Sequence, residues 1–250
     1  MNPAFLAFAN VWLLARLVAL FRDDAVEGRV WRLKAGFELI ALTVLYPCGV
    51  VWLAAVATVV ALNLIGYWLE RRAGRKDFGR LMLGLVGLAA WSVLFSPRLG
   101  LAFRPEFSEG FGRLARWTTL NPMFHALGGV RFQLVLFGLL ISANEANLVI
   151  RAVFDRLDLK PRSLPAGGGV VDVGEFNRGR VIGILERVLL YAFVLQGQYG
   201  AIGFILAAKA FTRFKALDDR PFAEYVLIGT LLSACLALAT GGTVHWLLRH

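Results

Sequence analysis

Long apolar segments recur from one end of this chain to the other, and they constrain the fold more than any motif does. A helix needs about 17 to 25 mostly apolar residues to cross the roughly 30 Å hydrocarbon core of a membrane. Segments of this kind lie at 4–21, 31–47, 49–69, 81–97, 129–150, 180–196, 199–214 and 222–240. The sequence therefore predicts an all-α fold, a polytopic bundle of about eight transmembrane helices joined by short loops.

The composition agrees with this class of protein. Hydrophobic residues make up 58% of the 250 positions and charged residues 18%, whereas soluble domains have about 45–50% and about 25%. No long polar block has the length to fold alone outside the bilayer. We therefore expect a single integral membrane domain over 1–250, with four spans in 1–97, an outside segment at 98–128, and four spans in 129–250.

The division inside 36–69 depends on four residues. This stretch is too long for one comfortable crossing, and Tyr46-Pro47-Cys48-Gly49 interrupts it. Proline lacks an amide donor and glycine tolerates a turn, so the chain is expected to reverse there. The alternative is one long kinked helix, which would force one of the two neighbouring basic clusters to the outside.

Basic residues gather in the segments between the apolar runs. With the N-terminus outside, nineteen Lys and Arg residues fall in inside segments and five in outside segments. This bias is typical of proteins of the bacterial inner membrane. The net charge of +10 therefore indicates membrane orientation and not nucleic acid binding, and the loops at 70–80 and 155–178 are expected in the cytoplasm.

Two of the connections between apolar runs are longer than the others, and each has two possible structures. The segment 98–128 mixes aromatic and basic residues, so it is either an amphipathic helix along the membrane interface or an ordinary surface loop. The segment 155–178 contains Gly167-Gly168-Gly169. Because no Gly-Lys-Ser/Thr follows these glycines, a flexible linker is favoured over a phosphate-binding loop.

Ionisable residues are embedded in the apolar runs of the C-terminal half. The stretch GRVIGILERVLL at 179–190 places Glu186 and Arg187 roughly 10 Å into their helix from the inside end. Charges at such depths cost several kcal/mol unless they are paired or wetted. Counting along the other spans predicts that further polar groups reach the same inner third of the membrane. The candidate ligand-binding residues are Glu186, Arg187, Lys209, Arg213, Glu224, Tyr225, Glu145 and Asn147.

Glu186 and Arg187 are adjacent, so they point about 100° apart on a helix and need separate partners. Lys209 or Arg213 is the expected partner of Glu186, because the short link at 196–200 makes their helices antiparallel neighbours. Glu224 is then the expected partner of Arg187. Two interpretations stay open: the charges neutralise one another and fix helix packing, or they line a cytoplasmic pocket for an ion or an anionic head group.

Four sequence words in the C-terminal part support a resemblance. They are GRVIGILER at 179–187, GQYGAIGF at 197–204, AAKAFTRF at 207–214 and FAEYVLIGTLLS at 222–233. In their order they resemble the C-terminal part of an uncharacterised bacterial integral-membrane family, classed as a domain of unknown function. The resemblance covers 178–242 and departs at the N-terminus, where the family's short His- and Asp-containing segment is not found. It implies a membrane location and no particular activity.

A search for catalytic chemistry is mostly negative. The three histidines, His125, His245 and His250, lie far from any Cys or carboxylate pair with metal-ligand spacing, and Cys48 and Cys235 lie in apolar surroundings. We therefore assign no catalytic residue, metal or cofactor. Binding or transport of an ion or an anionic lipid ligand is favoured. The alternatives are an accessory subunit of a larger membrane complex and a membrane-embedded enzyme acting on a lipid head group. The expected partners are the lipid bilayer and a second copy or a membrane-complex subunit, and no nucleic acid.

Overall fold

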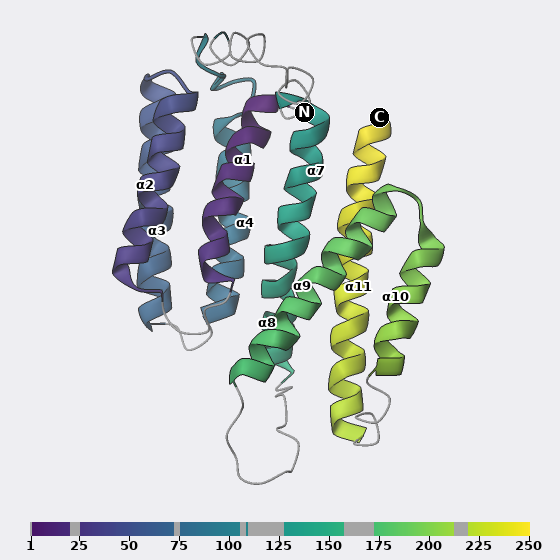
Figure 1. Ribbon diagram of the computed structural model, residues 1–250. Coiled ribbons are helices and arrows are strands. Elements are labelled where there is room, and N and C mark those ends of the chain that lie inside the picture. Colours follow the sequence, from purple (N-terminus) through teal and green to yellow (C-terminus); the bar gives the residue numbers. More distant parts are fainter. Residues whose placement is uncertain are drawn as a thin grey trace. The chain divides into compact units, whose positions relative to one another are not determined.

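The computed structural model describes residues 2–20, 26–72, 76–105, 109, 128–157, 173–212 and 220–250, and every regular element within them is a helix (Figure 1). These elements are α1 Pro3–Arg16, η1 Leu17–Ala19, α2 Gly28–Leu45, α3 Val50–Arg72, α4 Lys76–Leu94, α7 Val130–Leu140, η2 Ile141–Glu145, α8 Ala146–Arg156, α9 Val173–Leu195, α10 Tyr199–Thr212 and α11 Arg220–Arg249. The all-α prediction is confirmed, and a helix lies at each of the predicted apolar segments.

Four helical stretches of the described chain are long and apolar enough to cross a membrane. They are Val50–Arg72, Lys76–Leu94, Val130–Arg156 and Ala223–Arg249. Pro3–Arg16 and Tyr199–Phe211 are apolar but shorter, and α2 and α9 carry several charges. This set of helices is compatible with an integral membrane protein.

The chain turns between α2 and α3 as the Pro-Gly signal predicts. α2 ends at Leu45, α3 begins at Val50, and the two helices pack together. Tyr46 has φ −125° and ψ 147°, the extended conformation that a residue preceding proline adopts to avoid the proline ring. Its buried side chain also donates a hydrogen bond of 2.7 Å to the Ala4 carbonyl oxygen. Two helices over 36–69, and not one kinked helix, are therefore confirmed.

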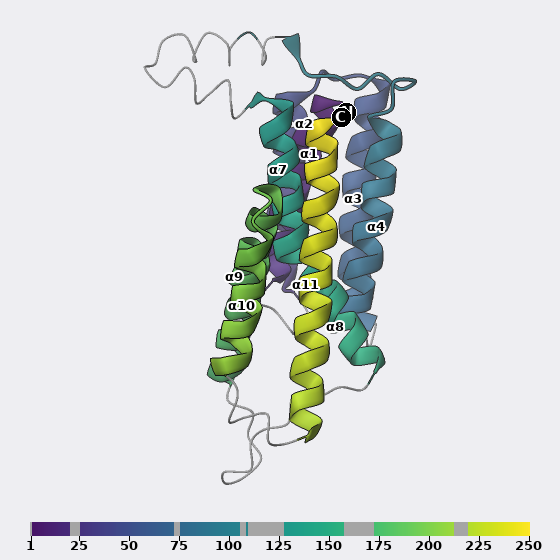
Figure 2. The same ribbon diagram turned by 90° about the vertical axis from the view of Figure 1, so that its right-hand side faces the viewer.

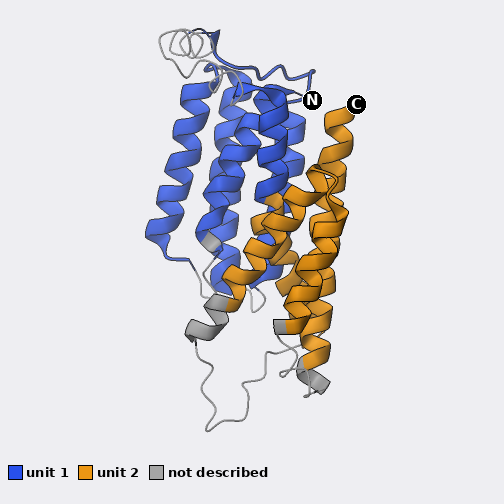
Figure 3. Ribbon diagram, turned by 45° about the vertical axis from the view of Figure 1, so that its right-hand side comes forward, with its two compact units in different colours: residues 1–140 blue, residues 141–250 orange. Residues whose placement is uncertain are grey.

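The chain separates into two compact units, unit 1 at residues 1–140 and unit 2 at residues 141–250 (Figure 3). In unit 1, α1 packs on α2, α4 and α7, while α3 packs on α2 and α4. Figure 2 shows α3 and α4 side by side. Trp12 and Trp91 are among its largest buried side chains. Gly87 makes room for the first of them, because a Cβ at this position would lie 2.4 Å from the Trp12 ring.

In unit 2, α9 is the central helix. It packs on α11, α10 and η2, and α11 also packs on α8. Leu190, Val194 and Ile202 form the apolar core with Ala234 and Ala237 of α11. The turn from α9 to α10 includes Gly197 at φ +69°, a left-handed conformation that favours glycine. This short turn makes α9 and α10 antiparallel neighbours (Figure 1).

Candidate functional site

Arg187 of α9 lies where three other helical segments of unit 2 converge. Its side chain is buried, with only 3% of the residue exposed. Nε donates to the carbonyl oxygen of Ser142 at 3.0 Å, Nη2 to Asn147 Oδ1 at 3.3 Å, and Nη1 to Ser233 Oγ at 3.4 Å. These acceptors belong to η2, α8 and α11, so one guanidinium joins four helical segments.

The segment η2 provides the acceptor at the shortest of these three distances. It is a π-helical turn of five residues, Ile141–Glu145, between α7 and α8. A π-helical turn interrupts the regular α-helical hydrogen-bond pattern, and such turns are frequent at functional sites. Here the Ser142 carbonyl oxygen accepts a hydrogen bond from the Arg187 side chain. The interruption of the helix therefore coincides with the position where it meets the buried charge.

All three acceptors of Arg187 are neutral oxygens. Within the part of the chain that the structure describes, no carboxylate contacts this guanidinium. A buried charge is ordinarily paired with an opposite charge, because its desolvation costs several kcal/mol. Arg187 has its hydrogen bonds but no counter-ion in contact.

Two polar groups beside Arg187 have no hydrogen-bond partner among the described residues. They are Ser142 Oγ and Asn147 Nδ2, both buried. There is also space on the α9 side: a Cβ added to Gly183 would meet a single atom within 4 Å, Arg187 Nη1 at 3.6 Å. A hydroxyl and an amide NH₂ thus belong to two residues that contact the Arg187 guanidinium, and that guanidinium also lies close to Gly183.

Glu186, the residue before Arg187, is engaged elsewhere. Its carboxylate forms an ion pair with Lys209 Nζ of α10, and both side chains are mostly buried. The predicted partner of Glu186 is therefore confirmed, and the pairing follows from the short turn between α9 and α10. Because Lys209 neutralises Glu186, this carboxylate is already occupied and does not serve as the contact counter-ion of Arg187.

We expect Glu186→Gln to lower the free energy of unfolding by about 1–3 kcal/mol, since it removes the carboxylate from an ion pair whose two side chains are mostly buried. Adding Lys209→Gln should restore most of that loss, because two neutral amides can hydrogen-bond to each other. Thermal unfolding of the detergent-solubilised single and double variants measures both effects. A double variant less stable than either single variant would contradict a simple pair.

The prediction that Glu224 pairs with Arg187 is wrong. The residue of α11 that meets Arg187 is Ser233, nine residues beyond Glu224 and so about 13.5 Å further along the helix. Glu224 is exposed near the start of α11. The apolar pattern of the sequence does not determine the register of α11 against α9, so the residue of α11 that faces Arg187 was predicted incorrectly.

The remaining predicted residues are distributed around unit 2. Tyr225 packs against the Phe154 ring, with the ring centroids 4.8 Å apart. Glu145 is buried in η2 and accepts a hydrogen bond of 3.0 Å from Asn144 Nδ2. Arg213 lies outside the described residues. Of the eight candidates, the structure thus joins Arg187 to Asn147 and, separately, Glu186 to Lys209.

The sequence argument missed Ser142 and Ser233. A neutral serine in an apolar helix carries no signal by itself, because it can bond to its own helix backbone. Helical spacing offers no signal either: Ser142 lies five residues before Asn147, about 140° away on a regular α-helix, and it is in the π-helical turn that precedes Asn147. No sequence pattern indicates that irregularity in advance.

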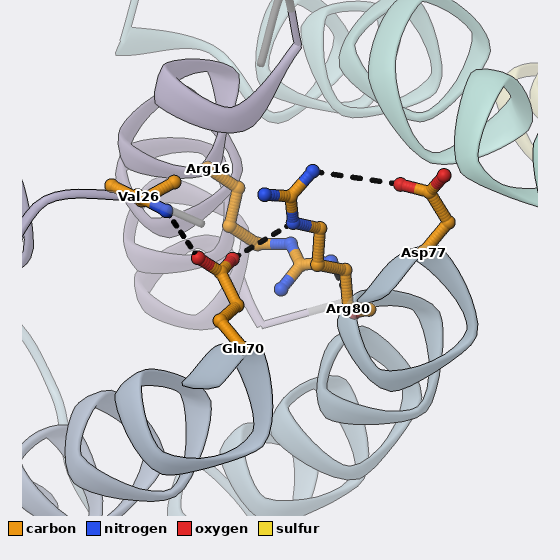
Figure 4. Close-up of polar contacts among 5 residues, drawn as sticks. All are labelled: Arg16, Val26, Glu70, Asp77 and Arg80. Atoms are coloured by element: carbon orange, nitrogen blue, oxygen red, sulfur yellow. Dashed lines mark hydrogen bonds and ion pairs between the residues drawn. The ribbon is translucent and has the colours of Figure 1, made fainter. Parts of the chain in front are cut away.

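Unit 1 contains a second group of buried charges, at the junction of α1, α3 and α4 (Figure 4). Glu70 accepts hydrogen bonds from the Val26 backbone N–H at 2.6 Å and from Arg80 Nε at 2.8 Å. Arg80 Nη1 lies 3.5 Å from Asp77 Oδ1, and Arg16 Nη2 donates to the Arg80 carbonyl oxygen at 2.9 Å. Two arginines and two carboxylates balance, so this cluster is suited to holding helices together.

Comparison with known proteins found no match for this chain among protein-family models, curated proteins or solved structures. The resemblance of 178–242 to an uncharacterised membrane family therefore stays a prediction.

Proposed function

We propose that this chain is a multi-pass protein of a bacterial inner membrane that binds a phosphate-class anion at Arg187 of unit 2. The observation that carries this proposal is a buried guanidinium whose contacts, among the residues that the structure describes, are all neutral oxygens. A buried cation without a counter-ion is costly. An anion that binds there neutralises the guanidinium, and the free energy gained in this way favours binding.

The donors around Arg187 favour phosphate or a phosphate ester over other ligands. A guanidinium has five N–H donors in a planar fork; three are used by protein oxygens, so two are left. Asn147 Nδ2 and the Ser142 hydroxyl add further unused donors. Tetrahedral oxyanions accept several such charge-assisted hydrogen bonds at once, which is why arginine recurs in phosphate sites.

A lipid head group is the favoured source of this phosphate. Counting from residue 180, where the predicted apolar span begins, puts Arg187 roughly 10 Å deep, below the layer of lipid phosphates on the cytoplasmic side. Arg180 is also buried, two turns earlier on the same face of α9. These two arginines offer positive charge from the inner interface down to the unpartnered donors.

The proposal includes the eight-span topology, with both termini outside. It is supported by the helices at all eight apolar segments and by the excess of basic residues in the segments assigned to the inside. In intact cells, with Cys48 and Cys235 replaced by alanine, a membrane-impermeant thiol reagent should label Ser108→Cys and not Gly168→Cys. Both positions lie outside the described residues. Labelling of Gly168→Cys from outside would rule out this topology.

Lipid binding by purified protein tests the anion site. In a neutral detergent, native mass spectrometry with phosphatidylglycerol, phosphatidylcholine or inorganic phosphate alone compares the possible ligands. We expect phosphatidylglycerol to be retained over phosphatidylcholine, and Arg187→Gln to weaken that retention about 10- to 100-fold, the value of a charged hydrogen bond of 1.5–3 kcal/mol. Arg249→Gln, an exposed arginine at the end of α11, removes the same charge as a control and should change nothing.

The outcomes separate the possible sources of the anion. Binding of inorganic phosphate without phosphatidylglycerol would assign the site to a soluble anion. Equal retention by the protein and by its folded Arg187→Gln variant, for every ligand, would contradict the proposal. If Arg187→Gln and Arg249→Gln lose lipid retention equally, the retention depends on the overall charge of the protein and not on the site at Arg187.

A further inference from the structure

Unit 1 contains a buried polar triad that the anion site does not use, formed by Lys34, Glu38 and Asn63. Glu38 is fully buried, with 0% of the residue exposed, and lies ten residues after the start of α2, about 15 Å along the helix. Lys34 Nζ donates to Glu38 Oε1 at 2.6 Å and to Asn63 Oδ1 at 3.0 Å. Asn63 Nδ2 in turn donates to Glu38 Oε2 at 2.7 Å, which closes a ring of three side chains.

The surroundings of the Lys34 ammonium resemble the ligand set of a small cation. A carboxylate oxygen and an amide oxygen contact it, and the Trp31 ring lies below it, 5.3 Å from Nζ to the ring centroid. Carboxylate and amide oxygens are the ligands that hard cations prefer, and an aromatic face attracts cations as well. The ammonium at the end of Lys34 occupies the centre of this set.

The Trp31 ring is positioned by the neighbouring helix. A Cβ added to Gly66 of α3 would lie 2.4 Å from Trp31 Cη2, so only glycine leaves the space that this ring fills. Asn63 and Gly66 are three residues apart on α3 and share a face. The same face of α3 thus supplies an amide oxygen to the ammonium and the space for the ring that lies below it.

Helix packing alone does not require this triad. Replacing a buried ion pair with apolar residues of similar size is often neutral or stabilising, and ionisable groups deep in a membrane usually mark functional sites. We propose that Glu38 and Asn63 form a site for an alkali cation that Lys34 fills in its protonated form, so that the cation and a proton exchange there. The proposal concerns unit 1 alone and is independent of anion binding at Arg187.

The exchange balances in atoms and charge. One N–H bond of the Lys34 ammonium breaks, its electron pair stays on nitrogen, and the proton leaves to water. The neutral amine then withdraws, and one Na⁺ or K⁺ takes its place between Glu38 and Asn63. Lys34 keeps 9% side-chain exposure whereas Glu38 has none, so the triad is reached from the lysine side. Arg16 of α1 and Glu70 of α3 are the other charged groups that act on Lys34, with opposite signs.

The experiment uses the full chain in neutral detergent, with NaCl or KCl compared against N-methylglucamine chloride at equal ionic strength. Two quantities are measured at pH 7 and pH 9.5: the melting temperature, and the protons released into weakly buffered solution. The variants are Lys34→Met, which removes the ammonium, Lys34→Arg, which keeps a cation that does not lose its proton, and the double variant Lys34→Met/Glu38→Gln, which also removes the carboxylate.

The expected results differ for each protein. Lys34→Met should gain roughly 5–10 °C in melting temperature at a hundredfold excess of cation over its Kd, at both pH values and without proton release. The melting temperature of the unaltered protein should rise with the cation only at pH 9.5, and about one proton should be released per cation bound. Lys34→Arg and the double variant should not respond.

A folded Lys34→Met variant that is indifferent to both cations would overturn the proposal. An equal response of the unaltered protein and Lys34→Arg would overturn it too, because the proton of Lys34 would then play no part. If Lys34→Met does not fold, the unaltered protein and Lys34→Arg are compared at pH 9.5, and this comparison tests the proposal by itself.

Discussion

Replacing Glu70 with alanine is expected to lower the free energy of unfolding by about 3–5 kcal/mol, because removing one partner of a buried ion pair leaves the positive charge of the cluster in excess. Glu70 holds the Arg80 guanidinium through Nε at 2.8 Å and the Val26 backbone N–H at 2.6 Å. Its loss would leave two arginines and one carboxylate in the buried cluster of Figure 4. Denaturant unfolding of the detergent-solubilised variant measures the change.

Two further variants test whether the loss of the Glu70–Arg80 ion pair is the cause of this destabilisation. Glu27→Ala removes an exposed glutamate that makes no capping hydrogen bond at the start of α2, so its effect should stay within about 0.5 kcal/mol. Glu70→Ala/Arg80→Ala should be less destabilised than the sum of its two single variants, because the double variant keeps one arginine and one carboxylate in the cluster and so restores its charge balance. Additive single effects would show that Glu70 and Arg80 do not act as a pair.

The helices of this protein could largely be predicted from the sequence. An apolar run of membrane-spanning length is a local signal, and every such run became a helix. The turn between α2 and α3 could be predicted for the same reason, since Pro47 restricts the conformation of Tyr46 whatever surrounds it. The same runs predict helices at α2 and α9, but these two charged helices are not among the four stretches that are long and apolar enough to cross a membrane.

Between different helices, the pairing of buried charges was predictable only where the chain makes a short turn. Glu186 and Lys209 are brought together by the connection between α9 and α10, which fixes both the direction and the register of the two helices. The partners of Arg187 depend on how α8 and α11 pack on α9, and on a π-helical turn at Ile141–Glu145. Packing of side chains sets such registers, and the apolar pattern does not encode them.

Only one of the two side-chain contacts of the Glu38 carboxylate could be predicted from the sequence. Its spacing of four from Lys34 predicts an ion pair on one helix face, and that pair forms at 2.6 Å. The third member, Asn63, belongs to α3 and is 25 residues away in sequence. The pair that the spacing on one helix predicts is therefore part of a closed triad that joins two helices.

Asn147→Asp is expected to abolish anion binding at Arg187 without damaging the fold. The substitution is nearly isosteric and replaces the neutral oxygen that Arg187 Nη2 contacts at 3.3 Å with a carboxylate. The protein would then carry its own counter-ion, and a phosphate would be repelled. Because a hydrogen bond between charged groups is worth about 1.5–3 kcal/mol, the anion-free protein should become more stable.

The same substitution one turn earlier provides the control. Asn144 is buried and donates to Glu145 Oε1 at 3.0 Å. Asn144→Asp would place two carboxylates in contact, so it should lower the stability of the protein. Opposite signs at these two asparagines would show that a negative charge is favoured at Arg187 and not throughout unit 2.

The melting temperature of Asn147→Asp with and without phosphatidylglycerol tests the central claim most directly. Our account predicts that the lipid stabilises the unaltered protein, that Asn147→Asp is more stable than the unaltered protein when no lipid is added, and that the lipid has no further effect on the variant. An Asn147→Asp variant that is less stable than the unaltered protein, or one that still responds fully to the lipid, would contradict an unneutralised anion site at Arg187.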